Sequence, residues 1–401
     1  CLDNHDLVII DKGGIISENI YNKRVIPEDF GDSQTPAPYS HWMLKEISEQ
    51  PASFLRSLNN GGRIDGYNIK LGGIEYLKPF VQEIKNIILL GCGTSYNACM
   101  VAKEYFRFCE NITSIQCIDG ADFTEEDISN IRYTLVIFCS QSGETKDLYR
   151  CLELCRKKKS AITLGVINVI DSLIAREVNC GVYLNAGREV AVASTKSFTS
   201  MLCVLAIIAI WIHQQRLFKQ VVHTGFVYSL RNLSSQIKQL NNTMSAIKTN
   251  EVKFTKIISN LNKQSLFILG TGKMEAIAKE GALKIKEVCY IHAEGCSSSS
   301  LKHGPFALLT KDFPIILLID KKNRNKLMNT YKEIAARDAN ILVISELKDL
   351  NVDNIINVPE NEHYQEILYV IVLQYLSYFL SIRRDINPDR PRNLAKVVTV
   401  D

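Results

Sequence analysis

The chain has 401 residues, of which 46% are hydrophobic, and a formal net charge of +4. This length predicts about two to three domains, and the composition is that of a globular protein with a substantial core. So small a net charge argues against a nucleic-acid-binding surface, although a mild positive balance suits small anionic substrates. The longest apolar run, residues 201–212, is too short to span a bilayer and predicts a buried helix instead.

The twelve cysteines are scattered along the chain, and none forms a CxxC pair or an interpretable metal spacing. Several lie inside apolar runs, as Cys139 does, which is typical of small buried hydrophobic side chains. We therefore expect a reducing, cytoplasmic setting, with no metal and no cofactor. The first residues do not have the pattern of a signal peptide.

The amino-terminal 40 residues differ from the rest. Residues 7–10 are strand-like and residues 12–14 form a turn, which predicts a small β element within the first 23 residues. Residues 24–40 are polar and hold three of the ten prolines, as a linker would. A helix is predicted over Trp42–Gln50, ended by Pro51.

Strands and helices then alternate. Apolar strands are predicted at residues 86–90, 133–139, 162–167 and 180–184, and helices follow the first two of them, up to Phe106 and over 145–158. Continuous apolar strands separated by helices are typical of a parallel sheet covered on both faces.

The turn after the strand at 133–139 can bind a phosphate. It reads Ser140-Gln141-Ser142-Gly143-Glu144-Thr145, and we call it the phosphate loop. A glycine-bearing loop between a strand and a helix offers backbone N–H groups and the positive end of the helix dipole, while the hydroxyls and the amide add donors. The loop lacks the Gly-Lys-Ser/Thr of a Walker motif. Ser95, after the preceding strand, can reach the same crevice; the alternative is a plain helix N-cap by Ser142 or Thr145.

The same order begins again in the second half. A strand at 264–269 is followed by Gly270-Thr271-Gly272 and a helix from Met274, and a later strand at 314–319 corresponds to the one at 133–139. A long helical region, residues 224–261, separates the halves. The pattern predicts a diverged duplication, in which only the first unit keeps the phosphate loop and therefore the one sugar-phosphate site.

Three further groups can carry chemistry. Glu280, Lys284 and Glu287 share one face of a mostly apolar helix, where a buried ion pair is costly unless it has a function; the alternative is an exposed salt-bridge ladder. His303 lies in a Gly-Pro turn, where it is free to meet a ligand. The carboxyl-terminal tail is apolar enough to dock, and docking would carry Lys396 into the body of the protein.

Together these motifs resemble the glutamine–fructose-6-phosphate aminotransferases, also called glucosamine-6-phosphate synthases. The resemblance extends from about Met43 to the end of the chain, and its most specific motif is the tail Pro391-Arg-Asn-Leu-Ala-Lys396. The other resembling segments are 45–51, 93–96, 140–145, 185–187, 192–196, 280–287 and 302–305.

The resemblance implies an α/β fold of two flavodoxin-like SIS domains, each a parallel sheet flanked by helices, plus a tail. Residues 1–40 would be a remnant of the glutaminase domain and its linker, 41–222 the first SIS domain with the sugar-phosphate site, 223–385 the second, and 386–401 the tail that closes the active site. It implies a homodimer. It also implies the isomerase half of the enzyme, which converts fructose-6-phosphate from ketose to aldose.

The family's residue roles carry over to matching positions. The phosphate would be held by Ser95, Ser140, Gln141, Ser142 and Thr145, and the sugar by the backbone of Val192 and Ala395. His303 of the neighbouring subunit would help to open the sugar ring, and Lys396 would form a Schiff base. Glu287 would move the proton between C1 and C2 beside Lys284. A glutamate with a shifted pKa can serve as the base of a ketose–aldose isomerisation, and a lysine amine can activate the carbonyl.

Some positions depart from the family. Ser299 and Ser300 replace the usual Gly-Glu, Arg188 a common Pro or Thr, and Val397 a common Ser; the serines either are compensated locally or reduce activity. Cys1 is followed by Leu-Asp-Asn and not by the Gly-Ile-Val-Gly of a glutaminase nucleophile, so we expect no glutamine hydrolysis by this chain.

Two other functions remain open: a deaminase or deglycase of the same superfamily, against which the tail argues, and a catalytically silent sugar-phosphate sensor, against which Glu287, Lys284, His303 and Lys396 argue. The turn-rich segment 61–73 is more similar to eukaryotic members. Those are often inhibited by UDP-N-acetylglucosamine bound to the first SIS domain, so this nucleotide sugar is a candidate inhibitor here.

Overall fold

The computed structural model describes residues 10–11, 14–15, 35–129, 133–216 and 223–396. The chain divides into two compact units, Cys1–Ala37 and Pro38–Asp401. In the first unit, β1 (Ile10–Asp11) pairs antiparallel with β2 (Gly14–Ile15). Of the strand predicted at 7–10, only Ile10 lies within the described residues, and Cys1 lies outside them.

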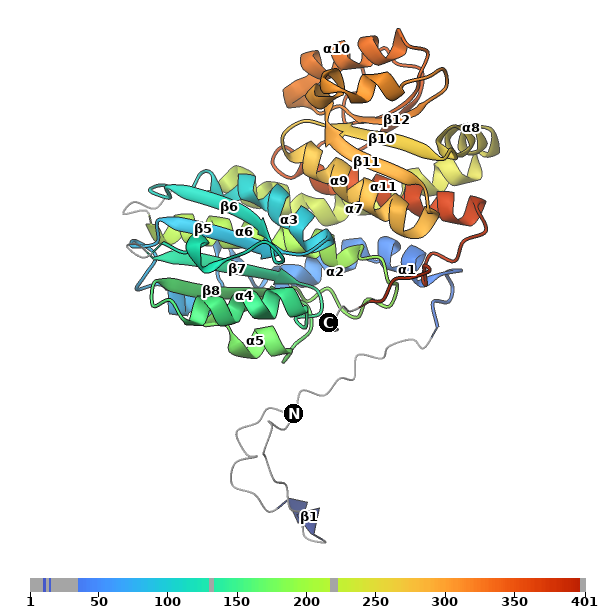
Figure 1. The fold of residues 1–401 in the computed structure, drawn as a ribbon. Helices are drawn as coiled ribbons and strands as arrows, with labels where there is room; N and C mark the ends of the chain where they lie inside the picture. Colours follow the sequence, from blue (N-terminus) through green and yellow to red (C-terminus); the bar gives the residue numbers. More distant parts are fainter. Residues whose placement is uncertain (1–9, 12–13, 16–34, 130–132, 217–222, 397–401) are drawn as a thin grey trace. The chain divides into compact units, whose positions relative to one another are not determined.

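The second unit contains a parallel sheet of five strands in the order β6-β5-β7-β8-β9 (Figure 1). This is the flavodoxin-like order 2-1-3-4-5. Its strands are β5 (Asn86–Gly91), β6 (Ser114–Asp119), β7 (Thr134–Ser140), β8 (Ala161–Ile167) and β9 (Cys180–Tyr183). The four predicted strands are confirmed to within about two residues at each end.

A second five-stranded parallel sheet repeats this order as β11-β10-β12-β13-β14. Its strands are β10 (Ser265–Gly270), β11 (His292–Ser297), β12 (Pro314–Leu318), β13 (Asn340–Ser345) and β14 (Ile355–Asn357). The turns after the first strands also match: Gly93 has φ 54° and ψ −122°, and Gly272 has φ 61° and ψ −127°. The predicted duplication and fold class are confirmed.

Helices cover both faces of each sheet, because successive side chains of a strand point to opposite faces. Ile87 and Leu89 of β5 enter the large core with α3 and α6, whereas Ile88 and Leu90 pack against α4 and α5. The helices are α1 (Trp42–Ser48), α2 (Gln50–Ser57), α3 (Thr94–Ala102), α4 (Lys146–Arg156), α5 (Leu173–Glu177), α6 (Lys196–Arg216), α7 (Thr224–Thr249), α8 (Glu251–Leu261), α9 (Lys273–Cys289), α10 (Arg324–Ala335) and α11 (Gln365–Arg383).

Short elements complete the second unit. They are the hairpin β3 (Ile64–Asp65) with β4 (Asn68–Ile69), and the 3-10 helices η1 (Asn59–Gly61), η2 (Gly72–Leu77), η3 (Lys103–Phe106), η4 (Glu125–Asp127), η5 (Ser298–His303), η6 (Pro305–Leu308) and η7 (Lys321–Asn323).

One predicted helix boundary was wrong, and the predicted helical region 224–261 is confirmed with a break inside it. Pro51 does not end the first helix: α1 ends at Ser48, and Pro51 lies in the first turn of α2, where its missing N–H needs no partner. The region 224–261 is two helices, because Asn250 ends α7 and its side chain accepts a hydrogen bond from Lys253 N at the start of α8.

By length and composition alone, α6 and α11 could each cross a membrane. In both, however, 94% of the most apolar window is buried inside the protein. The predicted burial of residues 201–212 is confirmed, and this burial accounts for the apolar composition of the helix.

Candidate active site

The strand order of the first sheet reverses between β5 and β7, and a ligand crevice is expected at such a point. The chain leaves β5 toward β6 on one side, and β7 lies on the other side of β5. In open α/β sheets, ligands bind outside the carboxyl ends of the strands at such a point. Ser95 lies one residue into α3 after β5, and the phosphate loop follows β7 directly. The two predicted phosphate-binding segments therefore occupy neighbouring strand ends.

The phosphate loop is a compact turn held by its own side chains. Ser140 Oγ accepts a hydrogen bond from Gly143 N at 2.9 Å, and Ser142 Oγ accepts one from Glu144 N at 3.2 Å. Thr145 is the N-cap residue of α4, yet its side chain makes no capping bond. The plain N-cap interpretation is thus not what the structure shows, and the first turn of α4 keeps N–H groups for an anion.

Gly143 is the residue that lets this loop close. Its φ is +69°, and a Cβ atom there would lie 2.0 Å from Ser172 Oγ. Its carbonyl accepts a hydrogen bond from Ile174 N at 3.0 Å, while Glu144 Oε1 accepts one from Leu173 N at 2.9 Å. The amino-terminal turn of α5 therefore supports the loop from behind.

Helix α9 of the second sheet brings a buried lysine to the first crevice. Lys284 Nζ donates to Thr94 Oγ1 at 3.0 Å, in the turn that also holds Ser95, and it lies 2.6 Å from Glu287 Oε2. Glu280 Oε1 is 3.5 Å from the same ammonium, and its Oε2 accepts from Asn97 Nδ2 at 2.8 Å. The predicted one-sided cluster is real and buried, because Glu280 and Lys284 are fully covered and only Glu287 is partly open.

Burial sets the electrostatics of this cluster. It raises the pKa of Glu280 to about 7, although Lys284 and Asn97 oppose the shift. Burial alone would lower the pKa of Lys284, but the carboxylates of Glu287 and Glu280 outweigh it and the pKa is raised. Lys284 is therefore a fixed cation, and Glu287 is the member of the cluster that is partly exposed.

The carboxyl-terminal tail docks as predicted. Lys396 Nζ lies 2.7 Å from Glu189 Oε2 and donates to Ala191 O at 2.8 Å. Glu189 also contributes to the raised pKa of Lys284, so the tail lysine and the α9 lysine share one electrostatic neighbourhood. Within the tail, Arg392 N donates to Tyr290 Oη at 2.7 Å, directly after α9.

The remaining predicted residues differ in their exposure and in their distance along the fold from the cluster around Lys284. Gln141 is half-buried in the phosphate loop, and Val192 N donates to Asp389 O at 3.1 Å, so only the carbonyl of Val192 is left for a sugar. Ala395 is exposed beside Lys396. His303 is exposed on η5, which follows β11 of the second sheet, and is not part of the cluster on α3 and α9.

Two hydrogen bonds in the serine run near His303 involve the side chains of Ser297 and Ser298, so the expected effect of Ser299 and Ser300 on activity stays a prediction. Ser297 Oγ accepts a hydrogen bond from Ser299 N, and the hydroxyls of Ser298 and Thr271 lie 2.8 Å apart. Arg188 lies in the segment before Glu189, and Val397 lies outside the described residues.

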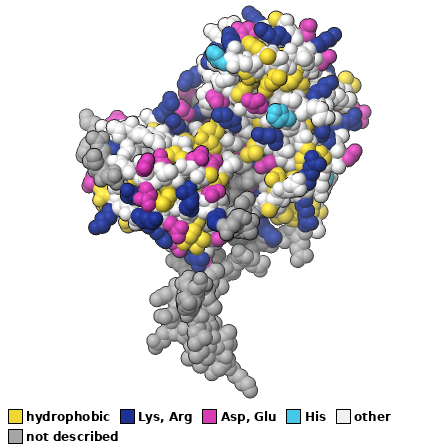
Figure 2. Space-filling view, in the orientation of Figure 1, with side chains coloured by type: hydrophobic (Ala, Val, Ile, Leu, Met, Phe, Trp, Pro, Cys, Tyr) yellow, Lys and Arg dark blue, Asp and Glu magenta, His cyan; other side chains and the backbone are white. Residues whose placement is uncertain are grey.

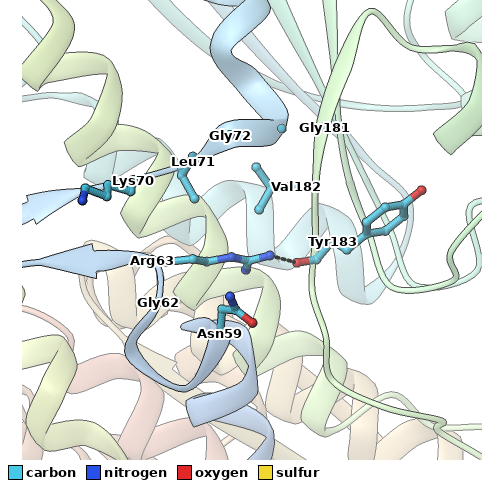
Figure 3. A pocket seen from close by; sticks show the side chains of 10 residues that line it. Asn59, Gly62, Arg63, Lys70, Leu71, Gly72, Gly181, Val182 and Tyr183 are labelled. Atoms are coloured by element: carbon cyan, nitrogen blue, oxygen red, sulfur yellow. Dashed lines mark hydrogen bonds between the residues drawn. The ribbon is translucent and has the colours of Figure 1, made fainter.

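A separate pocket of about 390 Å³ lies beside β9, an edge strand of the first sheet (Figure 3). Arg63 Nη2 donates to Tyr183 O at 2.8 Å, and Lys70 adds a second cation to the wall. The pocket shares no residue with the cluster around Lys284. On the face of the molecule in Figure 2, cations and anions are interspersed and do not form a field of one sign.

The interpretation of the sequence missed two carboxylates. Glu189 is fully buried at its side chain, and the ion pair with Lys396 and backbone N–H groups outweigh burial and lower its pKa to about 2. Glu46 of α1 accepts from Val190 N at 2.5 Å. Both lie in or beside segments that carried the family resemblance, but their partners are more than 140 residues away along the chain.

A model of the SIS domain matches residues 81–210 and again residues 261–383, one match for each sheet. The chain therefore belongs to the SIS-domain family. Within it, the similarity is to isomerising glutamine–fructose-6-phosphate aminotransferases, which confirms the resemblance stated above.

A probable enzyme of this name from Acanthamoeba polyphaga mimivirus is 43% identical over 372 residues, which are 92% of this chain and 59% of that protein. One from Schizosaccharomyces pombe is 37% identical, over 90% of this chain and 52% of its own length. The chain thus spans little more than half of these relatives. The C-terminal domain of the Francisella tularensis glucosamine-fructose-6-phosphate aminotransferase has a TM-score of 0.77 at 27% identity, over 89% of this chain and all of that one.

Proposed function

We propose that this chain is the isomerase half of an isomerising glutamine–fructose-6-phosphate aminotransferase. It binds fructose-6-phosphate and converts the ketose to the aldose, giving glucose-6-phosphate alone and glucosamine-6-phosphate when ammonia is supplied. The names of the relatives and the match to the Francisella tularensis domain support this proposal.

One observation carries the proposal: the contact of Lys284 Nζ with Thr94 Oγ1 joins the two domains at the candidate phosphate site. The ion pair of Glu287 with the same lysine, at 2.6 Å, supports a role for Glu287 beside Ser95 and the phosphate loop. The docked tail adds the amine of Lys396. A phosphate anchor, a base and an amine from three parts of the chain thus meet around one crevice.

The roles follow from chemistry. The phosphate loop and Ser95 hold the phosphate. The Lys396 amine, once deprotonated, attacks the C2 carbonyl and forms an iminium with loss of water. Ammonia, or water in its absence, then attacks the iminium carbon and frees the Lys396 amine, which leaves an imine or the ketone at C2. Glu287 takes the proton from C1 of this species and returns it to C2, with the charge on the sugar opposed by the fixed Lys284 ammonium.

Conversion of fructose-6-phosphate to glucose-6-phosphate, followed with glucose-6-phosphate dehydrogenase, tests the proposal. Glu287→Gln should abolish turnover and keep sugar-phosphate binding. A silent sensor would bind the sugar with no turnover in either form, and a deaminase would release ammonia from glucosamine-6-phosphate faster than it isomerises fructose-6-phosphate.

We also propose a homodimer in which His303 of one subunit serves the crevice of the other. Exposure of His303 away from the α3–α9 cluster supports this, as does its family role in ring opening. If the residues act across subunits, an equal mixture of His303→Ala and Glu287→Gln subunits that exchange freely should recover about a quarter of the wild-type activity, because about half of the dimers are mixed and one of the two sites in each is intact. A cytoplasmic setting fits the free thiols of the eleven described cysteines.

The pocket in Figure 3 is our candidate for the UDP-N-acetylglucosamine site. Its volume falls within the usual range for small ligands, and Arg63 and Lys70 suit a diphosphate. A side chain at Gly72 would meet nothing within 4 Å, so Gly72→Leu should obstruct the pocket without disturbing the core. A calorimetric titration should lose nucleotide-sugar binding in Gly72→Leu and retain it in Gly66→Ala; equal binding by both would move the site elsewhere.

A further inference from the structure

The segment 189–192 lies between helix α1 and the tail, and each binds one side of it. From α1, Glu46 Oε1 accepts hydrogen bonds from Val190 N at 2.5 Å and from Ala191 N at 3.3 Å. From the tail, Lys396 Nζ donates to Ala191 O at 2.8 Å. Residue Ala191 therefore has its N–H held by Glu46 and its carbonyl held by Lys396.

Asp389 closes this arrangement. Its two carboxylate oxygens accept hydrogen bonds from Trp42 N at 2.9 Å and Met43 N at 2.8 Å, at the start of α1. Its backbone carbonyl accepts one from Val192 N at 3.1 Å. Helix α1, the segment and the tail thus form one hydrogen-bonded unit around the Lys396 amine.

The charges in this unit are nearly balanced without Glu46. Glu189 is held by Thr195 N, Ser197 N and Ser197 Oγ, and its ion pair with Lys396 satisfies the ammonium. Lys196 is paired with Glu49 at 2.8 Å. A second anion at Glu46 would be surplus.

Glu46 itself has the surroundings of a neutral acid. Its side chain is 1% exposed, and its Oε2 atom is buried with no hydrogen-bond partner among the described residues. The charged groups that act on it are Glu189, Lys396 and Lys196. Burial, followed by the charge of Glu189, raises the pKa of Glu46 to about 8.

We propose that Glu46 is a positioning residue for Lys396, which holds the segment 189–192 beneath the amine and stays uncharged so that a single carboxylate faces it. The inference rests on the proposed function, in that the lysine must lose its proton before it attacks a carbonyl. A second carboxylate charge beside the ammonium would hold that proton more strongly. Glu46 therefore combines a geometric task with an electrostatic one.

Chemical labelling of Lys396 tests this without any substrate. The chain is treated with trace acetic anhydride between pH 6 and pH 10, and acetylation of Lys396 is measured by peptide mass spectrometry. Glu46→Gln keeps the hydrogen-bond acceptor but cannot ionise, whereas Glu46→Ala removes both functions. Glu49→Gln is the matched control. It removes a carboxylate at the end of the same helix, and that carboxylate pairs with Lys196 and not with Lys396.

The expected pattern has two parts. At pH 6–7, Glu46→Gln labels at the wild-type rate, and near pH 9–10 it labels about 3–10-fold faster, because the wild type then carries the extra negative charge. Glu46→Ala labels faster at every pH, since Val190 and Ala191 lose their acceptor and the segment no longer fixes the tail. Glu49→Gln follows the wild type throughout.

Equal labelling of Glu46→Gln and wild type across the pH range overturns the electrostatic task, and equal behaviour of Glu46→Ala and Glu46→Gln overturns the geometric one. The glutamine variant decides the first point even if the alanine variant unfolds. Borohydride trapping of fructose-6-phosphate on Lys396 tests the proposed function separately from the role of Glu46. If the labelling pattern is as expected but no adduct is trapped, the Schiff base is refuted and the role of Glu46 stands.

Discussion

Gly143 offers the sharpest test of the phosphate loop. Its φ of +69° is a conformation that residues with a Cβ rarely adopt, and an added Cβ would lie 2.0 Å from Ser172 Oγ, 2.7 Å from Ser172 Cβ and 2.9 Å from Ile167 Cγ2. Gly143→Ala must therefore displace either the loop or the turn at Ser172. Since Ser172 precedes α5, whose first turn supports the loop, both displacements disturb the candidate phosphate site.

The size of the effect has two parts. An alanine at positive φ costs about 1–2 kcal/mol, and overpacking of a filled site adds about 1–3 kcal/mol. The free energy of unfolding should therefore fall by about 2–5 kcal/mol. Movement of N–H groups that must converge on one phosphate should weaken fructose-6-phosphate binding by at least about tenfold, which corresponds to about 1.4 kcal/mol.

Urea unfolding and a calorimetric titration with fructose-6-phosphate measure the two effects. Gly66→Ala is the matched control, because Gly66 has φ +60° but no atom within 4 Å of an added Cβ, so it carries the backbone cost alone. Adding Ser172→Gly to Gly143→Ala removes two of the three close contacts and should restore part of both losses. If Gly143→Ala matched Gly66→Ala in stability and kept wild-type affinity, the loop would not be the phosphate site inferred here.

Three further predictions concern the residues around the crevice. Lys284→Met should abolish isomerisation and lower the free energy of unfolding by about 3–5 kcal/mol, because it leaves a buried carboxylate without its cation; urea unfolding checks this. The pKa of Glu280 is raised to about 7 in the folded state, so the native protein holds that proton more tightly than the unfolded chain. The free energy of unfolding of the wild type should therefore fall by up to about 3 kcal/mol relative to that of Glu280→Gln as the pH rises from about 4.5 to 7, with no further fall above pH 7. Urea unfolding at several pH values measures this, and a pH-independent difference contradicts it. Asp389→Ala should cost about 1 kcal/mol by exposing two N–H groups of α1, and it should speed tryptic cleavage of the tail.

The sequence predicts most of the first sheet and the phosphate loop because their signals are local. An apolar strand, a glycine turn and an amphipathic helix lie within about 30 residues, and the duplication repeats them. The same local view misjudged Pro51, since a proline that ends one helix and a proline that opens the next have the same sequence pattern until the helix starts are known.

Glu46, Glu189 and Asp389 show what local patterns cannot reveal. Each is an acidic residue, a type that is rarely buried and that by composition alone favours exposure. Their burial follows from partners that the fold brings from far along the chain: Glu46 reaches Val190, Glu189 reaches Lys396, and Asp389 reaches Trp42. Only the family resemblance marked the neighbouring segments, and it assigned these three residues no role.

The second sheet gives a reason to expect only one phosphate site from the duplication. In each sheet a helix follows the first strand, and the two helices differ at their first residue: α3 begins with Thr94, whereas α9 begins with Lys273. Lys273 forms an ion pair with the buried Glu366 at 2.8 Å. After β12, where the phosphate loop would stand, Asp320 accepts a hydrogen bond from Asn323 N. The protein's own carboxylates thus occupy the positions where an incoming anion would be held. Helix α9, freed from binding a ligand at its own amino terminus, presents Lys284 and Glu287 to the crevice of the first sheet instead.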